Sequence, residues 1–195
     1  MNYLAHIYLS GNDQEILIGN FIADAVKGSD WQHYSKGVQK GIHLHRAIDH
    51  FTDTHDIVRE SKSKLWARYR HYNAVIIDIF YDHFLAKGWD NYHKISLPAF
   101  VEDTYHQLEQ QKHRFPERIQ HLLHYMIKHD WLLGYRSLEG VQSVMNGMSR
   151  RTSFNSGMEN STEELIQHYD EFEQEFETFF PLLIEFSNTT LASLE

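Results

Sequence analysis

Apolar residues recur every three or four positions along most of the chain, which is the period of an amphipathic α-helix. The alternation of apolar and polar residues that marks a strand is almost absent. The pattern therefore predicts an all-α fold. Helices are expected over residues 13–27, 35–54, 56–70, 72–87, 97–111, 116–133, 138–148 and 163–186. Residues 149–162 are largely polar and are expected to form a long loop before the last helix.

The ends of these helices carry residues that favour helix boundaries. Asn12 or Asp13 suits an N-cap, because a short polar side chain accepts hydrogen bonds from the free amides of the first turn. Gly28 suits the position where the first helix stops. Pro116 falls in a first turn, where its missing N–H group costs nothing. Asp56 is expected to cap the helix that begins there.

One compact helical domain is expected, because 195 residues suffice for a single core and no linker divides the chain. This domain is expected to cover residues 1–193, with residues 194–195 as the remnant of an expression tag. Cysteine is absent, which favours a reducing compartment. No apolar run reaches the roughly 18 residues of a membrane-spanning helix. The composition therefore predicts a soluble cytoplasmic protein with no membrane association.

The formal net charge of −9 argues against general nucleic-acid binding, which needs a concentrated basic surface. Two basic clusters stand out against this balance. One comprises Lys62, Lys64, Arg68 and Arg70, and the other comprises Arg150 and Arg151. Solvated helix faces are the simplest interpretation, and an acidic partner is the alternative.

The most unusual segment is residues 41–53, which holds three histidines, an arginine and two aspartates within a predicted helix. Side chains four residues apart share a helix face, so His45, Asp49 and Asp53 form a ladder with His43 nearby. An apolar stripe runs beside this ladder. Imidazoles and carboxylates at the border of a buried stripe suit a metal site, whereas a solvated face more often carries Lys and Glu.

Two further segments place polar side chains among apolar residues. His6 lies in an apolar run at the N-terminus, where a core histidine bonded to a carbonyl and a metal ligand are about equally favoured. Asp24 follows three apolar residues and shares a helix face with Asn20. A buried carboxylate needs a cation or several donors, so Asp24 either has such a partner or lies exposed near a helix end.

The helix expected over residues 72–87 has a wide apolar face and should be central. Asp78, Asp82 and His83 interrupt it. Asp78 is most simply explained by exposure to water. Asp82 and His83 are harder to explain as surface residues and favour a functional site.

Histidine and aspartate without cysteine suit a hard or borderline divalent ion such as manganese, magnesium or iron. Such an ion lowers the pKa of bound water and binds phosphoryl oxygens. Arg46 has paired donors that match a phosphate. Metal-assisted phosphoester hydrolysis is therefore the first reaction class that the residues favour.

Five motifs in order carry a resemblance to a known family. They are MNYLAH at residues 1–6, GNFIAD at 19–24, GIHLHRAID at 41–49, YDHFL at 81–85 and NGM at 146–148. This set resembles the acyl carrier protein phosphodiesterases. The resemblance implies a helical fold related to the HD-domain phosphohydrolases. It also implies manganese-dependent hydrolysis of the phosphodiester that joins phosphopantetheine to a serine of holo acyl carrier protein.

The resemblance also implies site residues. Asp24 matches the aspartate that the family treats as essential, and the other polar motif residues are His6, His43, His45, Asp49, Asp82 and His83. We expect His45, Asp49, Asp82, Asp24 and His43 around the metal. His83 or His6 would be a further ligand, an acid or an orienting group. Arg46 and Asn20 would hold the phosphate or the ligands. Unlike the adjacent His-Asp pair of HD-type sites, the matched motifs contain Asp82-His83 in reverse order.

A carrier protein presents acidic helices around its modified serine, so basic residues are expected to dock it. The candidates are Arg46, Lys62, Arg68, Arg150 and Arg151, of which Arg150 and Arg151 are preferred. Two alternatives remain at this stage. One is an HD-type phosphohydrolase that acts on a nucleotide or another small phosphoester, and the other is a helical binding protein without catalysis.

Overall fold

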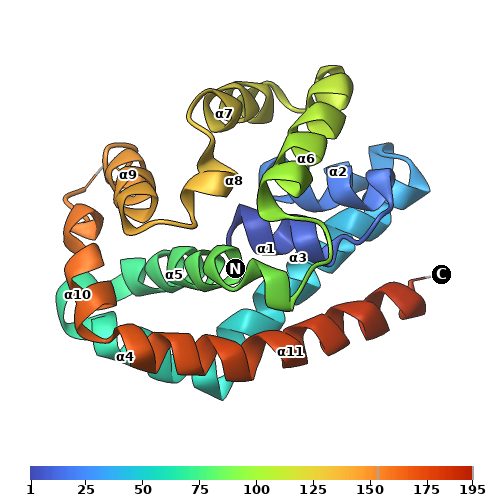
Figure 1. The fold of residues 1–195 in the computed structure, drawn as a ribbon. Coiled ribbons are helices and arrows are strands. Elements are labelled where there is room, and N and C mark those ends of the chain that lie inside the picture. The colour runs from blue at the N-terminus through green and yellow to red at the C-terminus, as the bar shows by residue number, and fades with distance from the viewer. Residues whose placement is uncertain (153, 195) are drawn as a thin grey trace.

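A computed structural model describes residues 1–152 and 154–194, and over these ranges the chain is helical and contains no strand (Figure 1). The predicted all-α class is confirmed. The described helices are α1 (Tyr3–Leu9), α2 (Gln14–Ile22), α3 (Lys36–Thr54), α4 (Asp56–Tyr69), α5 (Asn73–Lys87), α6 (Leu97–Gln111), α7 (Glu117–Lys128), α8 (Trp131–Gly134), α9 (Leu138–Ser149), α10 (Thr162–Gln167) and α11 (Tyr169–Ser193). The expected tag remnant at 194–195 includes residue 195, which lies outside the described residues.

Most boundaries follow the sequence pattern. Asp13 caps α2, because its carboxylate accepts hydrogen bonds from the amides of Glu15 and Ile16. At the start of α4 the cap is His55, whose side chain accepts from the Ile57 amide, and Asp56 is the first helical residue. The expected cap at Asp56 is therefore shifted by one position.

Two expected helices are each divided in the structure. The helix expected over 116–133 breaks at Asp130, which adopts a φ of 46° and separates α7 from α8. Aspartate tolerates this left-handed conformation better than most residues. The helix expected over 163–186 breaks at His168, so that α10 packs on α9 while α11 packs on α3, α4 and α5.

Helix α1, which the apolar pattern did not predict, is anchored to α5. The Asp82 carboxylate is completely buried and accepts hydrogen bonds from the backbone amides of Asn2, Leu4 and Ala5. Asp82 thereby satisfies amide groups that have no partner within the first turn of a helix. One turn earlier on α5, Asp78 Oδ1 lies 2.9 Å from the Met1 amino group. These contacts fix α1, and with it His6.

Helices α2 and α3 cross at two glycines. A Cβ atom on Gly19 would lie 2.1 Å from the Val38 carbonyl oxygen, and one on Gly41 would lie 2.2 Å from the Ile16 carbonyl oxygen. Both obstacles are backbone atoms, so only glycine allows this approach. The close crossing brings Asn20 of α2 next to His45 of α3.

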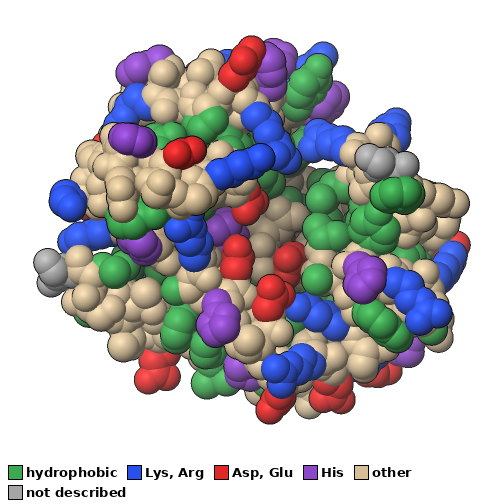
Figure 2. Space-filling view, turned by 180° about the vertical axis from the view of Figure 1, so that it is seen from behind, with side chains coloured by type: hydrophobic (Ala, Val, Ile, Leu, Met, Phe, Trp, Pro, Cys, Tyr) green, Lys and Arg blue, Asp and Glu red, His purple; other side chains and the backbone are tan. Residues whose placement is uncertain are grey.

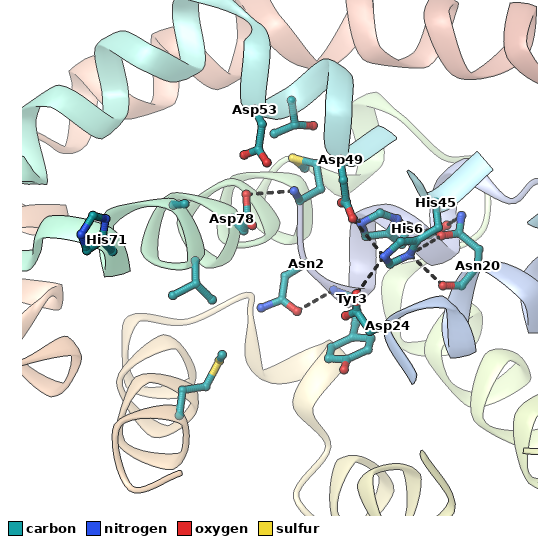
Figure 3. A pocket seen from close by; sticks show the side chains of 15 residues that line it. Asn2, Tyr3, His6, Asn20, Asp24, His45, Asp49, Asp53, His71 and Asp78 are labelled. Carbon is teal, nitrogen blue, oxygen red and sulfur yellow. Dashed lines mark hydrogen bonds and ion pairs between the residues drawn. The ribbon is translucent and has the colours of Figure 1, made fainter. Parts of the chain in front are cut away.

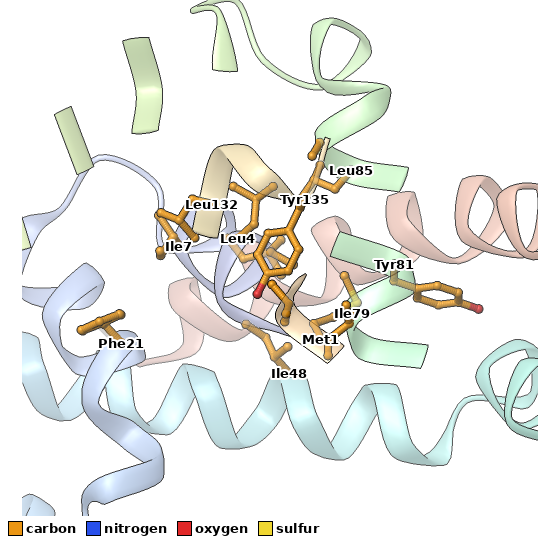
Figure 4. Close-up of a cluster of buried hydrophobic side chains, with 14 of the residues drawn as sticks. Met1, Leu4, Ile7, Phe21, Ile48, Ile79, Tyr81, Leu85, Leu132 and Tyr135 are labelled. Atoms are coloured by element: carbon orange, nitrogen blue, oxygen red, sulfur yellow. The ribbon is translucent and has the colours of Figure 1, made fainter. Parts of the chain in front are cut away.

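The core lies around α5, whose Ile76, Ile77 and Phe80 are completely buried. Helix α11 crosses one side of the molecule and contributes buried phenylalanines such as Phe176 and Phe179 (Figure 1). Figure 4 shows the part of this core around α1, formed by apolar side chains from several helices. Buried side chains of α1, α3 and α5 therefore share one core.

Candidate metal centre

Four elements of the N-terminal part bring polar side chains together (Figure 3). Helix α1 contributes His6, α2 contributes Asn20, and the 3₁₀ turn Ala23–Ala25 contributes Asp24. Helix α3 contributes His45 and Asp49, which share a face because they are four residues apart. We call these five residues the cluster.

One carboxylate of the cluster faces two imidazoles. Asp49 Oδ1 lies 3.2 Å from His6 Nε2, and Asp49 Oδ2 lies 3.1 Å from His45 Nε2. The two rings stack with their centroids 4.0 Å apart. His45 Nε2 is also 3.2 Å from Asp24 Oδ1. The Nε2 atoms and the carboxylates of Asp24 and Asp49 therefore converge on one place.

Asn20 holds the other side of both rings. Its Oδ1 lies 2.8 Å from His6 Nδ1 and 3.0 Å from His45 Nδ1. Its amide group donates to the His6 carbonyl oxygen and to Ser10 Oγ, which leaves Oδ1 as the acceptor for the rings. The Asn20 backbone oxygen also lies 2.9 Å from His45 Nδ1. Both imidazoles therefore carry a proton on Nδ1. A protonated ring also donates from Nε2 to a carboxylate, whereas a neutral ring keeps its Nε2 lone pair free for a cation.

The charges in the cluster are unevenly shared. Burial lowers the pKa of His45, but the hydrogen bonds to Asp24 and Asp49 outweigh burial and raise this pKa to about 9. Burial and the neighbouring His45 lower the pKa of His6. Burial alone would raise the pKa of Asp49, yet the neighbouring imidazoles of His45 and His6 hold it well below its usual range. In the metal-free protein, a proton on His45 therefore partly balances the carboxylates.

The donor set suits a divalent cation. One atom from each of His6, His45 and Asp49 lies within 4.8 Å of the others, a spacing that a metal ion could bridge. Metal-binding histidines usually donate their second N–H group to a carbonyl or carboxylate, and Asn20 Oδ1 lies at the corresponding position here. Asp24 adds a carboxylate whose side chain is 67% exposed, so it reaches solvent. These residues form a possible divalent metal site.

Two predicted site residues, Asp82 and His83, lie away from the cluster. Asp82 binds the amides of α1 and presents no carboxylate oxygen to His45 or Asp49. His83 is buried on another face of α5, where Nδ1 is 2.7 Å from the Tyr135 carbonyl oxygen and Nε2 is 2.7 Å from the Tyr169 hydroxyl. Consecutive helix residues point about 100° apart, so Asp82 and His83 face different neighbours.

The remaining predicted residues make their contacts outside the cluster. The His43 ring packs against Trp31, with centroids 4.5 Å apart. Arg46 is exposed and donates to the Val26 carbonyl oxygen, two residues beyond Asp24. Arg150 and Arg151 line a groove of about 280 Å³ beside α9.

A pocket of about 370 Å³ extends from the cluster. Four aspartates line it, and Figure 2 shows acidic side chains in a central hollow with Lys and Arg side chains around it. Thr52 also lines the pocket and was not among the predicted residues. Its position three residues after Asp49 on the same helix face was the available signal.

Tyr3 also lines the pocket. Burial raises the pKa of Tyr3 to about 12, and the guanidinium groups of Arg118 and Arg151 oppose this shift. Arg118 was not among the predicted residues.

Among the described residues, no helix combines the length and hydrophobicity that crossing a membrane requires.

Comparison with known proteins gives one consistent family. A family model described as acyl carrier protein phosphodiesterase matches residues 1–183. The acyl carrier protein phosphodiesterase of Photorhabdus laumondii is 36% identical over 186 residues, which cover 95% of this chain and 94% of the relative. The protein of the same name from Yersinia enterocolitica is 34% identical, with 94% and 96% covered.

A third relative with this name, from an Enterobacter species, is 33% identical over 193 residues and is covered completely. No solved structure matches significantly, so the relation to the HD-domain fold stays a prediction. Because the family model and these relatives span nearly the whole chain, the protein belongs to the acyl carrier protein phosphodiesterase family.

Proposed function

We propose that the protein is a manganese-dependent phosphodiesterase that removes phosphopantetheine from holo acyl carrier protein. The observation that carries this proposal is the orientation of His6 and His45, whose Nε2 atoms face Asp49 at one end of a pocket. Family membership supplies the substrate class. Hydrolysis breaks the bond between the phosphorus and the serine oxygen, and water supplies the atoms that complete apo carrier and phosphopantetheine.

His6, His45 and Asp49 would hold the ion, and Asp24 would complete its protein ligands. Two imidazoles and one or two carboxylates without thiolate suit Mn²⁺ or Fe²⁺. The bound ion would lower the pKa of water and neutralise phosphoryl oxygens. Asn20 would position both histidines and would not contact the ion itself.

Asp24 and Arg46 would act on the substrate side. Asp24 is the most exposed carboxylate of the cluster, and its hydrogen bond to His45 lowers its pKa, so it is ionised at neutral pH. A carboxylate that holds the ion through one oxygen could accept a proton from the attacking water through the other. Arg46 uses one N–H group on Val26, and its other donors suit a phosphoryl oxygen.

The groove beside α9 would receive the carrier. Arg150 and Arg151 line it together with Trp131 and the 49% exposed Tyr125. The Arg151 guanidinium lies over the Trp131 ring at 5.0 Å. Exposed aromatic and arginine side chains are frequent in binding interfaces. The positive charge of the two arginines would attract an acidic helix of the carrier.

The docking role has a direct test. The double variant R150E/R151E should raise KM for holo carrier at least tenfold and leave hydrolysis of bis(p-nitrophenyl) phosphate unchanged. The matched control R59E/K112E reverses two surface charges outside the groove and should change neither reaction. Equal loss on both substrates in R150E/R151E would contradict a docking role.

The substrate class is tested by competition with nucleotides. The metal-loaded protein is incubated with holo carrier and, separately, with a panel of nucleotides and cyclic nucleotides. Release of phosphopantetheine with intact nucleotides supports the proposal. Consumption of a nucleotide with intact holo carrier would instead support the HD-type alternative.

A further inference from the structure

The pocket continues well beyond the metal-binding residues. Figure 3 shows Asp53 and Asp78 between the cluster and His71. Helices α3 and α5 provide most of the wall here, and Met148 of α9 contributes to it. We call this part, lined by Thr52, Asp53, Val75, Asp78 and Met148, the arm pocket.

The two carboxylates of the arm pocket already have cationic partners. Asp53 Oδ1 lies 2.6 Å from Lys62 Nζ, and Asp78 Oδ1 lies 2.9 Å from the Met1 amino group. Because these pairs balance the charge, a second metal ion has little electrostatic advantage here. Each carboxylate still has lone pairs that can accept hydrogen bonds from a neutral ligand.

Thr52 offers a polar group that lacks a partner. Within the described residues its Oγ1 atom is buried and has no hydrogen-bond partner, and the whole residue is 1% exposed. A buried hydroxyl without a partner is costly, and such groups are rare in folded proteins. A ligand in the arm pocket would supply the missing hydrogen bond.

The same pocket has apolar wall segments. Val75 of α5 and Met148 of α9 line it, and both are only partly buried. Part of their apolar surface is therefore exposed to water in the free protein, and a ligand with methyl or methylene groups would cover it. The arm pocket thus combines hydrogen-bond acceptors, one hydroxyl and apolar surface.

We propose that the arm pocket binds the pantetheine part of the substrate while the phosphodiester lies at the cluster. This inference rests on the function proposed above. Pantetheine is a neutral chain with two amides, one secondary hydroxyl and a dimethyl-substituted carbon. Its N–H and O–H groups match the acceptors of Asp53, Asp78 and Thr52, and its carbon groups match Val75 and Met148.

The contribution of the arm pocket to binding affinity is measured by comparing two ligands that both carry a phosphate group. The manganese-loaded protein is titrated calorimetrically with 4′-phosphopantetheine and with ethyl phosphate. The wild-type protein should bind 4′-phosphopantetheine at least tenfold more tightly. Equal affinity for the two ligands would overturn the arm pocket, even if holo carrier is hydrolysed.

Two variants test whether the additional affinity comes from residues of the arm pocket. T52V removes only the hydroxyl and should weaken 4′-phosphopantetheine binding about three- to tenfold, with unchanged affinity for ethyl phosphate. V75W should fill the pocket and abolish the difference between the ligands. The matched control T54V changes an exposed threonine two residues further along α3 and should have no effect.

Turnover separates this inference from the proposed function. In T52V the KM for holo carrier should rise while kcat stays the same. The inference fails if T52V and a folded V75W both bind 4′-phosphopantetheine and ethyl phosphate as the wild-type protein does. The proposed function would be unaffected by that result. If holo carrier is not hydrolysed at all, the function fails, whatever the titrations give.

Discussion

The imidazole rings of His6 and His45 stack 4.0 Å apart although they come from different helices. Two protonated rings at this distance would repel each other, and the environment gives them opposite tendencies. The pKa of His45 is raised to about 9, whereas that of His6 is lowered. The pair therefore carries one positive charge near neutral pH, at the place where a divalent cation could bind to the same Nε2 atoms.

Removing the support of the rings should weaken metal binding without unfolding the protein. N20A deletes the oxygen that faces Nδ1 of both histidines. Loss of such an outer hydrogen bond typically costs 10- to 100-fold in metal affinity, and we expect about that loss for Mn²⁺. Titration calorimetry measures the affinity. H50Q, which changes an exposed histidine of α3, serves as the control and should bind Mn²⁺ normally.

The affinity for Mn²⁺ should increase as the pH rises. Below about pH 9, the metal-free protein holds a proton on His45 that a bound ion must displace. The affinity for Mn²⁺ should therefore rise between pH 7 and 9, by up to about tenfold per pH unit, and level off above. Calorimetry in buffers with different ionisation enthalpies counts the released protons. Binding that releases no proton at pH 7.5 would contradict this charge assignment.

The α2–α3 crossing should not tolerate a methyl group. G41A places a Cβ atom against the Ile16 carbonyl oxygen, and such overpacking typically lowers the free energy of unfolding by about 1–3 kcal/mol. It should also move Asn20 away from His45 and weaken Mn²⁺ binding. The control G147A has open space around its Cβ position and lies in helix α9, so it should stabilise the protein slightly. Urea unfolding of both variants measures the difference.

The sequence predicted the parts of the site that depend on local geometry. His45 and Asp49 are four residues apart on one helix, so their common face follows from the helical period alone. The same reasoning marked Asp82 as unlikely to face water, and this residue is indeed buried. Its partners, however, are the amides of α1, and contacts between distant segments cannot be read from periodicity.

Other features depended on packing that no local pattern encodes. The family resemblance grouped His83 with the site, but His83 lies between Tyr135 and Tyr169 on another face of α5. The break at Asp130 follows from a single backbone conformation inside an otherwise helical pattern. Thr52 is an ordinary helix residue in sequence, and only the fold places it beside the pocket with a buried hydroxyl that, among the described residues, has no partner.

The most direct test of the account is mass spectrometry of purified holo acyl carrier protein incubated with this protein and Mn²⁺. We predict that the carrier loses the mass of phosphopantetheine and that free phosphopantetheine appears. H45Q should abolish this loss, and H50Q should retain it. An unchanged carrier mass with metal-loaded, folded protein, or equal activity in H45Q, would contradict the assignment of the cluster as the catalytic centre.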